Sequence, residues 1–264
     1  MEYLSSEWLV PYITAFGYAT PRLFAIFTML PMFTRQALPG LLRVAVAASL
    51  GLFLMPFLLE PADAPSRNGV LIVMLVMKEV LLGMLLGVVL ALPIWAMEAM
   101  GDVIDNQRGA SVAQTLSPLT GHDTSPLGDL FSQAAMVFLL VSGGFMLMLA
   151  AIYDSYRLWP VYDWVPQLAP ETPMYLLGLM DRLLRLAILM GAPVIIAMFL
   201  AEVGLALVSR FAPQLQVFFL AMPIKSGLAM MVLAVYAVIL FDFFGLEMTD
   251  VGRDMLFELS RILR

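Results

Sequence analysis

Long apolar stretches alternate with shorter polar connectors along the chain. Six stretches stand out when hydrophobicity is averaged over windows of about 19 residues. Each is long enough, at ~1.5 Å of rise per helical residue, to cross or nearly cross a hydrocarbon core of ~30 Å. They cover residues 8–30, 41–59, 70–97, 130–152, 183–207 and 215–241. The pattern predicts an all-α, multi-pass membrane-type protein with about six apolar, Pro/Gly-interrupted helical segments.

Several of these stretches contain residues that lipid tolerates poorly. Pro21 and Arg22 lie inside the first stretch and Lys78 and Glu79 inside the third, while the last two each contain a proline near a glycine. A charge at the centre of a lone span costs about 2.5–3.5 kcal/mol on insertion scales, and proline removes a backbone hydrogen bond. We therefore expect helices interrupted at the prolines, with protein or water around the buried charges Arg22, Lys78 and Glu79.

The spacing of Lys78 and Glu79 makes a further prediction. Adjacent positions on a helix point ~100° apart, so the two side chains are not expected to satisfy each other. We expect each to find its own partner, with at least one partner on another segment or another chain.

Composition strengthens the membrane prediction. Hydrophobic residues make up 62% of the 264 positions and charged residues 13%, against about 45–50% and about 25% in soluble domains. So few charges cannot cover a soluble protein of this size, whereas a surface in contact with lipid does not need them. The net charge of −6 forms no basic stripe, so nucleic acid is not an expected partner. Cysteine is absent, which excludes disulfides and thiolate chemistry.

Residues with catalytic potential are few. His122 is the single histidine and cannot complete an ordinary zinc site in a chain without cysteine, so a solvent-exposed loop histidine explains it. Asp102 and Asp105 would share one helix face, either as an acid–base pair or, far more commonly, as a solvated helix end. There is no phosphate loop, nucleophile elbow or HExxH motif. We expect no catalytic residue, metal site or cofactor, and no enzymatic activity.

The connector after the third apolar stretch predicts a helical stem followed by a long loop. Glu98, Asp102, Asp105 and Arg108 recur at the spacing of one helical face. From residue 109 to residue 129 the sequence is rich in the small and turn-forming residues Gly, Ser, Thr and Pro. Loops of this length are uncommon unless they are functional or disordered. Two interpretations are open: a solvated connector, or a loop that gates or plugs a passage.

Residues 209–227 form the second unusual segment. Pro213 and Pro223 lie ten residues apart and bracket a short amphipathic turn, and Lys225 follows. One interpretation is a kinked helix whose lysine reaches the membrane interface. The other is a helical hairpin whose tip packs against partner subunits, with the ammonium of Lys225 buried against a carboxylate or against free backbone carbonyls.

At these two segments the sequence resembles the FliR/SctT family (YscT, SpaR, EscT), which are export-apparatus components of flagellar and virulence type III secretion systems. The resemblance is carried by SRFAPQLQVFFLAMPIKSG at 209–227, and by DNQRG at 105–109 followed by SPLTGHDTSPLG at 117–128. The latter pair is closer to the virulence SctT branch than to flagellar FliR. Chain length, the placement of the apolar segments and a short charged tail are also similar to the family.

The resemblance implies a structural and gating subunit of the type III export gate, which admits unfolded substrate proteins to a channel across the bacterial inner membrane. One copy would join SctR and SctS homologues in a hetero-oligomer, with SctU and SctV homologues nearby, and would contact exported polypeptides and membrane lipid. The assembled gate would lie largely above the membrane plane on the periplasmic side. Within a single helical unit, residues 1–180, including loop 106–129, would resemble SctR, and residues 181–264 would form an SctS-like hairpin with a charged tail.

The two segments also carry the expected site residues. The resemblance places the pore plug at Gly109, Ala110, Ser111, Val112, Ala113, Gln114 and Leu116. We expect the loop to be anchored on its stem, through charge-assisted hydrogen bonds, by Asp102, Asp105, Asn106 and Arg108. Contacts with other subunits are expected at Pro213, Phe218, Phe219, Pro223 and Lys225.

A secondary transporter or permease is the alternative function. Apolar segments interrupted by Gly and Pro are typical of that class too, because substrates bind at the ends of half-helices near the midplane. The lack of a visible repeat between the two halves of the chain argues against it. Assembly separates the two hypotheses: a permease purifies alone or as a symmetric oligomer, whereas an export subunit purifies with SctR and SctS homologues.

Overall fold

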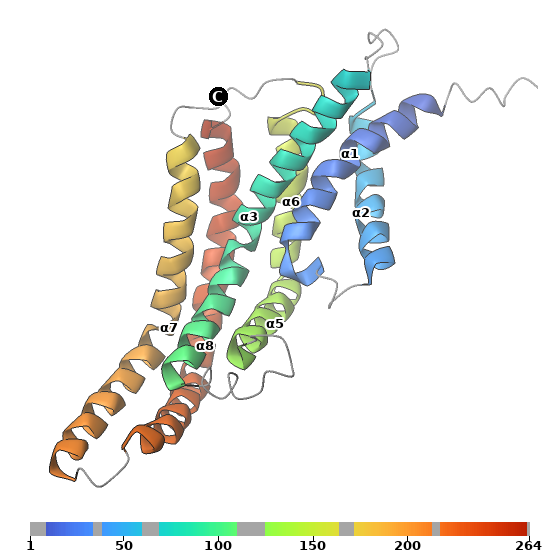
Figure 1. Ribbon diagram of the computed structural model, residues 1–264. Coiled ribbons are helices and arrows are strands. Elements are labelled where there is room, and N and C mark those ends of the chain that lie inside the picture. The colour runs from blue at the N-terminus through green and yellow to red at the C-terminus, as the bar shows by residue number, and fades with distance from the viewer. Residues whose placement is uncertain are drawn as a thin grey trace, which may run out of the picture. The chain divides into compact units, whose positions relative to one another are not determined.

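All regular structure in the described part of the chain is helical, as predicted (Figure 1). The computed structural model describes residues 9–33, 39–59, 69–109, 125–163, 172–212 and 217–262. Two short 3-10 helices, Pro31–Phe33 (η2) and Met55–Phe57 (η3), accompany the α-helices. The α-helices are α1 (Val10–Met29), α2 (Gly40–Leu54), α3 (Gly69–Arg108), α5 (Pro126–Val141), α6 (Gly144–Leu158), α7 (Thr172–Phe211) and α8 (Val217–Ile262).

The helices that could cross a membrane are slightly fewer than the approximate count of six expected. Over the described residues four are long and apolar enough, at 40–57, 69–107, 177–211 and 220–251, or five if α5 and α6 form one broken span. The first expected segment is present as α1 but is not among them, because its Tyr, Thr, Pro and Arg residues lower its hydropathy. The fourth is divided at Gly143, whose φ of +81° is a conformation that favours glycine.

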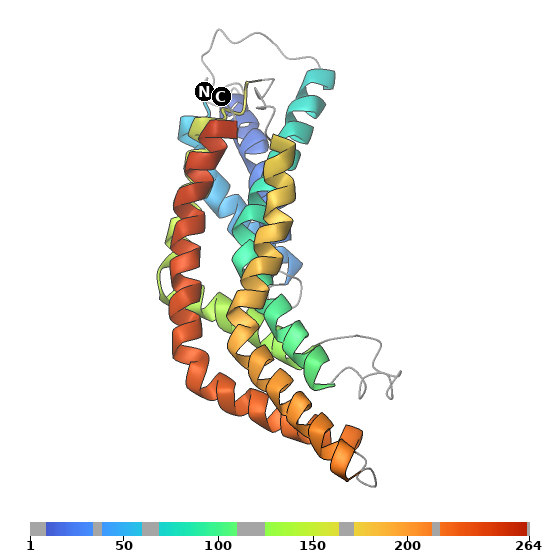
Figure 2. The same cartoon turned by 90° about the vertical axis from the view of Figure 1, so that its left-hand side faces the viewer.

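The prolines kink the helices less than expected. The sequence predicts interruptions at Pro21, Pro193 and Pro223, but α1, α7 and α8 each continue through their proline. A proline removes only one backbone hydrogen bond, and a long helix tolerates that loss when the neighbouring turns remain intact. Each of these prolines therefore lies inside a helix that continues on both sides of it. A bend remains visible in the part of α8 that follows Pro223 (Figure 2).

The chain divides into two compact units. Unit 1 comprises Met1–Ala91, Gly143–Tyr175 and Thr249–Arg264, and unit 2 comprises Leu92–Ser142 and Leu176–Met248. Helices α3, α7 and α8 each contribute to both units. This division follows contacts and differs from the division near residue 180 that the family resemblance implies, which stays a prediction.

Close helix packing in unit 1 depends on glycines of α3. A Cβ on Gly83 would collide with the backbone carbonyl of Arg22, and one on Gly87 would lie 2.8 Å from the Cβ of Met29. The backbones of α1 and α3 therefore approach more closely than larger residues allow. Ala25 and Ile26 of α1 lie at this contact and are buried.

In unit 2, α7 and α8 form an antiparallel hairpin. Arg182 of α7 donates to Glu247 of α8 at 2.6 Å, and Glu202 of α7 accepts from Lys225 of α8 at 2.9 Å. Arg182 lies early in α7 and Glu247 late in α8, whereas Glu202 lies late in α7 and Lys225 early in α8. The two helices therefore run in opposite directions. Helix α5 packs on α8 through Phe138, whose ring centroid lies 5.5 Å from that of Phe241.

Candidate functional site

The stem of the long loop is the last turn of α3. The polar face predicted at residues 98–108 is helical, and the helix ends at Arg108. Gly109 adopts φ +83° and donates its N–H to the carbonyl of Asn106 at 3.2 Å, which closes the helix as glycine commonly does at this position. Arg108 in the last turn places a positive charge at the negative end of the helix dipole. The expected helical stem is confirmed.

Asp105 holds the chain on both sides of segment 110–124. Its Oδ1 accepts from Nε of Arg108 at 2.6 Å, while its Oδ2 accepts from the hydroxyl of Ser125 at 2.7 Å and from the N–H of Leu127 at 2.9 Å. The carboxylate is buried, which strengthens these charge-assisted bonds. The Ser125 hydroxyl also accepts from the N–H of Gly128 at 3.0 Å, so it caps α5. One carboxylate therefore fixes where the segment leaves α3 and where it reaches α5.

Helices α3 and α5 touch backbone to backbone beneath this clamp. A Cβ on Gly101 would lie 2.5 Å from the N atom of Gly128, and a Cβ on Gly128 would collide with the carboxylate of Asp102. One turn further from the loop, the hydroxyl of Ser132 donates to Glu98 at 3.2 Å. Asp102 thus lies against the start of α5, whereas Asp105 makes the contacts with the residues that flank the loop.

Helix α8 reaches the same stem through one of its faces. The ammonium of Lys225 donates to the carbonyl of Gln107 at 3.2 Å, and Nη1 of Arg108 donates to the hydroxyl of Ser226 at 3.2 Å. The side chain of Met222 lies 3.4 Å from the position that a Cβ on Gly109 would occupy. Lys225 therefore finds both a carboxylate, that of Glu202, and a backbone carbonyl within its own chain.

The structure adds residues to this site that the sequence analysis missed. Glu202 of α7 pairs with Lys225, Ser226 of α8 with Arg108, and Ser125 with Asp105. Gln107 also donates from Nε2 to the carbonyl of Ile195 at 3.4 Å, which ties the stem to α7. A lone carboxylate in an apolar stretch indicates a functional or paired position. Glu202 is such a residue, so the sequence could have identified it.

Most of the expected plug lies outside the described residues. Gly109 is described, whereas Ala110, Ser111, Val112, Ala113, Gln114, Leu116 and also His122 are not. Of the expected subunit contacts, Pro213 is outside the description, and Phe218 and Phe219 are described only as part of α8. Pro223 is exposed in this chain and Asn106 lies on the exposed side of the stem. The plug and subunit-contact roles stay predictions.

The charged residues of the first and third apolar stretches meet in unit 1. Arg22 of α1 donates to both carboxylate oxygens of Glu79 on α3, at 2.7 and 3.0 Å, and both side chains are fully buried. Arg22 also donates to the hydroxyl of Ser155 at 3.2 Å and to the carbonyl of Trp159 at 2.9 Å. The ring of Tyr156 lies 4.1 Å from the guanidinium carbon. This cluster joins α1, α3 and α6.

Lys78 caps the turn that follows α6. Its ammonium donates to the carbonyls of Val161 at 2.6 Å and Asp163 at 2.8 Å. The expectation of partners on another segment is right for Lys78 and for Glu79. The expectation that the two do not pair with each other is wrong, because Nζ of Lys78 lies 3.1 Å from Oε1 of Glu79. The length and flexibility of the lysine side chain overcome the angle between adjacent helical positions.

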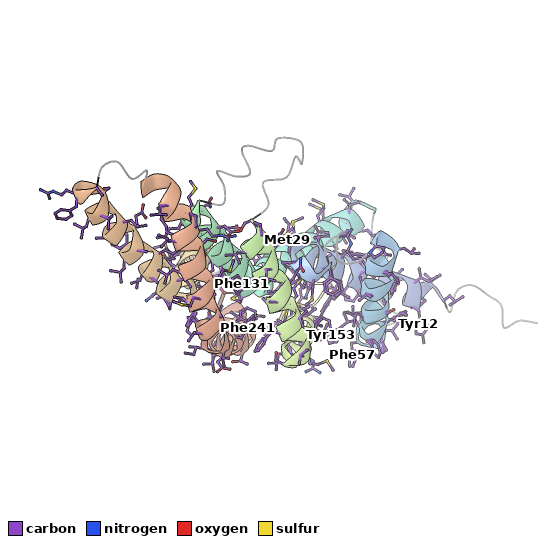
Figure 3. The ribbon with its side chains drawn as sticks, turned by 90° about the horizontal axis from the view of Figure 1, so that it is seen from below. Tyr12, Met29, Phe57, Phe131, Tyr153 and Phe241 are labelled. Carbon is purple, nitrogen blue, oxygen red and sulfur yellow. The ribbon has the colours of Figure 1, made fainter. Side chains whose placement is uncertain are left out.

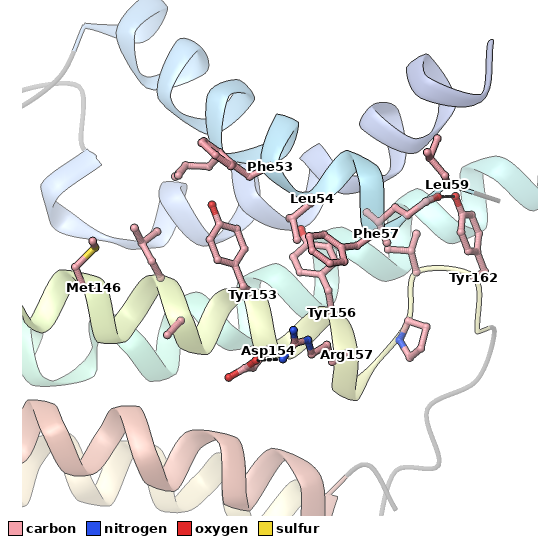
Figure 4. Close-up of a pocket in the computed structure, with 16 residues that line it drawn as sticks. Phe53, Leu54, Phe57, Leu59, Met146, Tyr153, Asp154, Tyr156, Arg157 and Tyr162 are labelled. Carbon is pink, nitrogen blue, oxygen red and sulfur yellow. Dashed lines mark hydrogen bonds and ion pairs between the residues drawn. The ribbon is translucent and has the colours of Figure 1, made fainter. Parts of the chain in front are cut away.

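Unit 1 also contains an apolar pocket of about 1110 Å³ between α2, η3 and α6. Tyr153 of α6 points toward Phe53 of α2 across it (Figure 4). Tyr153 and Phe57, which both line the pocket, lie close together in the view of Figure 3. The lining is mainly apolar, with Asp154 and Arg157 as its charged members. It has no arrangement of nucleophile, base or metal ligands.

Residues 13–251 match the protein family described as bacterial export proteins, family 1. The chain belongs to this family. Yop proteins translocation protein T of Yersinia pestis is 41% identical over 219 residues, which cover 82% of this chain and 83% of the relative. Surface presentation of antigens protein SpaR of Salmonella typhimurium is 34% identical over 223 residues (84% and 81%). Flagellar biosynthetic protein FliR of Bacillus subtilis is 28% identical over 221 residues (83% and 85%).

Membership confirms the resemblance carried by the two motifs: the chain is a type III secretion export component of the FliR/SctT family. Identity is higher to translocation protein T and SpaR than to FliR, in agreement with the expected virulence branch. The matched relatives are export proteins and not enzymes, as predicted for this chain. With its apolar helices, the chain is an inner-membrane protein that works with other export components.

Proposed function

We propose that this chain is a structural and gating subunit of the type III export gate. One copy assembles with SctR and SctS homologues, with SctU and SctV homologues nearby. The assembly forms the channel through which unfolded polypeptides cross the inner membrane, and it lies largely on the periplasmic side of the membrane plane. The loop at 106–129, with its plug residues between Gly109 and Leu116, closes this channel in the resting state.

The clamp made by Asp105 is the observation that carries the proposal. A closed gate has to retain ions and small molecules and still admit a polypeptide. A loop whose two ends are fixed to one carboxylate can move its middle aside without unfolding the helices that hold it. The loop is rich in small residues such as Ala110, Ser111 and Ala113, with Val112 and Leu116 as apolar filler. Such a loop seals by filling space and costs little packing when it opens.

The unburied apolar surface supports assembly with other chains. Only 17% of the candidate span in α2 and 22% of that in α8 are buried inside the chain. Lipid covers part of such surface, but helices that carry Pro223 and Lys225 favour protein neighbours. We therefore assign subunit contacts to the segment from Pro213 to Lys225.

Deletion of residues 110–116 tests the plug. The gate should assemble in normal amount, because the clamp residues Asp105, Ser125 and Leu127 are retained, but the membrane should become permeable to small solutes. The measurement is ion or solute flux into cells at equal amounts of assembled complex. Replacement of the same residues by a Gly/Ser sequence of equal length is the control that separates loop length from apolar filling. Equal flux in wild type and deletion, with an intact complex, would show that the loop is only a connector.

Co-expression tests the assembly. The chain alone should be unstable or aggregated, and SctR and SctS homologues should rescue it, with one copy of the chain per complex by native mass spectrometry. A monodisperse monomer in mild detergent would contradict the proposal and favour the permease hypothesis.

A further inference from the structure

Helix α8 has an apolar face that the described part of the chain leaves uncovered. On one side of the helix, Leu233, Leu240 and Phe244 are buried, and the ring of Phe244 packs on Phe138 of α5. The opposite side carries four large apolar side chains that are 62–80% exposed: Val235, Val238, Ile239 and Leu246. Their spacings of three, four and seven residues place them in one continuous stripe along the helix. All of these residues belong to unit 2.

A single carboxylate interrupts this stripe. Asp242 follows Ile239 by three residues and precedes Leu246 by four, so it lies in the middle of the stripe, and it is exposed. Among the described residues, none forms a hydrogen bond or an ion pair with it. Asp242 also lies nine residues before the end of the apolar stretch 220–251, which is about 13 Å along a helix. The short side chain of aspartate does not span that distance.

The other two carboxylates of the α7–α8 hairpin differ from Asp242. Glu247 pairs with Arg182 at 2.6 Å, and Glu202 pairs with Lys225 at 2.9 Å. Each of these carboxylates therefore has a cation within its own chain. Asp242 is on the side of α8 that faces away from the buried residues, so its cation has to come from outside the chain.

The chemistry of the stripe determines what can cover it. Lipid tails offer no hydrogen-bond donor, and aspartate is among the most costly residues to expose to them. Water solvates a carboxylate but would leave four large apolar side chains in an aqueous surrounding. An apolar helix that carries one lysine or arginine satisfies both parts of the surface, because its apolar side chains pack on the stripe and its cation pairs with Asp242.

We propose that the stripe around Asp242 is a docking surface for an apolar helix of another export component, and that this helix supplies a lysine or arginine to Asp242. The inference rests on the assembly proposed above and adds the chemistry of one contact. The surface is distinct from the segment between Pro213 and Lys225, which lies in the earlier part of the hairpin. The carboxylate fixes the level at which the partner helix docks, since the apolar stripe alone would allow it to slide.

Neutralising Asp242 in the assembled export complex tests the docking surface. Asp242→Asn should reduce the amount of chain recovered in the complex about threefold to tenfold, the range for one polar contact between helices in a membrane. A neutral asparagine is easier to place in lipid than a carboxylate, so poorer insertion cannot explain such a loss. Asp242→Glu retains the charge and should keep most of the complex.

Two further variants serve as controls. Asp250→Asn removes an exposed carboxylate of the same helix, one residue from the end of the apolar stretch, and should leave the complex unchanged. Arg185→Gln removes an exposed cation of α7 and should also leave it unchanged, because the partner of Asp242 belongs to another chain.

Photo-cross-linking identifies the partner. A benzophenone amino acid in place of Val238, one turn from Asp242 on the same face, should cross-link to a helix of another chain, with a lysine or arginine within about one turn of the cross-linked residue. Asp242→Arg should then lose the complex, and changing that basic residue of the partner to glutamate should restore it.

The possible outcomes separate this surface from the proposed function. An unchanged or larger amount of complex in Asp242→Asn would overturn the inference, because Asp242 would then face lipid or water. An equal loss in Asp250→Asn or Arg185→Gln would overturn it too, as would a cross-link to lipid alone or to a helix without a basic residue. In each of these cases an intact complex with SctR and SctS homologues would leave the proposed function standing. If the chain forms no complex with them, both the function and the docking surface are wrong.

Discussion

The chain contains two clusters of charged side chains, one around Arg22 and Glu79 in unit 1 and one around Asp105 in unit 2. They use similar residue types for different purposes. In unit 1, Arg22 and Glu79 are fully buried and joined by two hydrogen bonds. In unit 2, Asp105 is buried and accepts from Arg108 in the last turn of α3. The carbonyl of Gln107 in the same turn accepts from Lys225, whose carboxylate partner Glu202 is more than half exposed. The first cluster joins helix to helix, whereas the second joins helix ends to a loop.

The difference in exposure determines what each cluster can do. Breaking a buried pair leaves a charge without solvent or partner and typically costs about 3–5 kcal/mol. Breaking a partly exposed pair costs about 1 kcal/mol or less. A cluster of the first kind defines how α1, α3 and α6 pack. One of the second kind can be broken and re-formed by thermal motion, which suits a part that moves.

The largest effect is expected for Glu79→Gln. Arg22 and Lys78 would then share their surroundings without a carboxylate, and the chain should lose roughly 3–5 kcal/mol of stability. The measurement is the thermal stability of the purified export complex and the amount of chain recovered in it. The double variant Arg22→Met with Glu79→Leu should recover much of the loss, because it removes both charges and fills the space with apolar groups. A double variant as unstable as the single one would show that the whole polar network is needed.

Gly101→Val should come next and disturb the rigid base of the loop. The added side chain would press on the backbone of Gly128, which cannot move without shifting the start of α5. Overpacking of this kind typically destabilises a protein by about 1–3 kcal/mol. The α5 cap should move away from Asp105, so less complex should form and the remainder should leak. Gly204→Ala in α7 is the control, because nothing lies within 4 Å of its Cβ position. Comparable losses in both variants would remove the role assigned to the α3–α5 contact.

Asp105→Asn should affect the loop more than the fold. An asparagine presents one oxygen and one NH2 group, so it cannot accept from Arg108 on one side and from Ser125 and Leu127 on the other. One side of the clamp is lost, at a cost of about 1–3 kcal/mol. The complex should assemble, and solute flux should rise. An unchanged flux, with the complex intact, would mean that the loop stays closed without the clamp.

The sequence predicted the helical fold and the charged positions better than the pairing between them. Local signals identified Arg22, Lys78 and Glu79 as charges in apolar helices, and the spacing of polar residues identified the stem up to Arg108. The choice of partner depends on helix packing, which joins residues 57 positions apart in the case of Arg22 and Glu79. No local pattern encodes that distance.

The same limit explains Glu202 and the prolines. Glu202 is a lone carboxylate in an apolar stretch, but only the antiparallel path of α7 and α8 brings it to Lys225. Pro21, Pro193 and Pro223 are strong local signals for interruption, yet the long helices around them continue. The turns on both sides of each proline remain helical, so the loss of one hydrogen bond does not end the helix.

The smallest effect is expected for Arg157→Ala, two positions after Ser155 on the same helix that supports the buried cluster. Its side chain is 79% exposed and lies 3.4 Å from Asp154, so water already solvates the charge and the pair is weak. The change should alter stability by less than about 0.5 kcal/mol, in contrast to Glu79→Gln in the same unit. Thermal stability of the assembled complex provides the measurement, with Arg157→Lys as the control that retains the charge. Because Arg157 also lines the apolar pocket, a large loss would show that another molecule covers it in the assembly. The exposure of Arg157 would then belong only to the isolated chain, without its neighbour in the assembly. The contrast between the buried and the exposed charges would then hold for the isolated chain and not for the assembly.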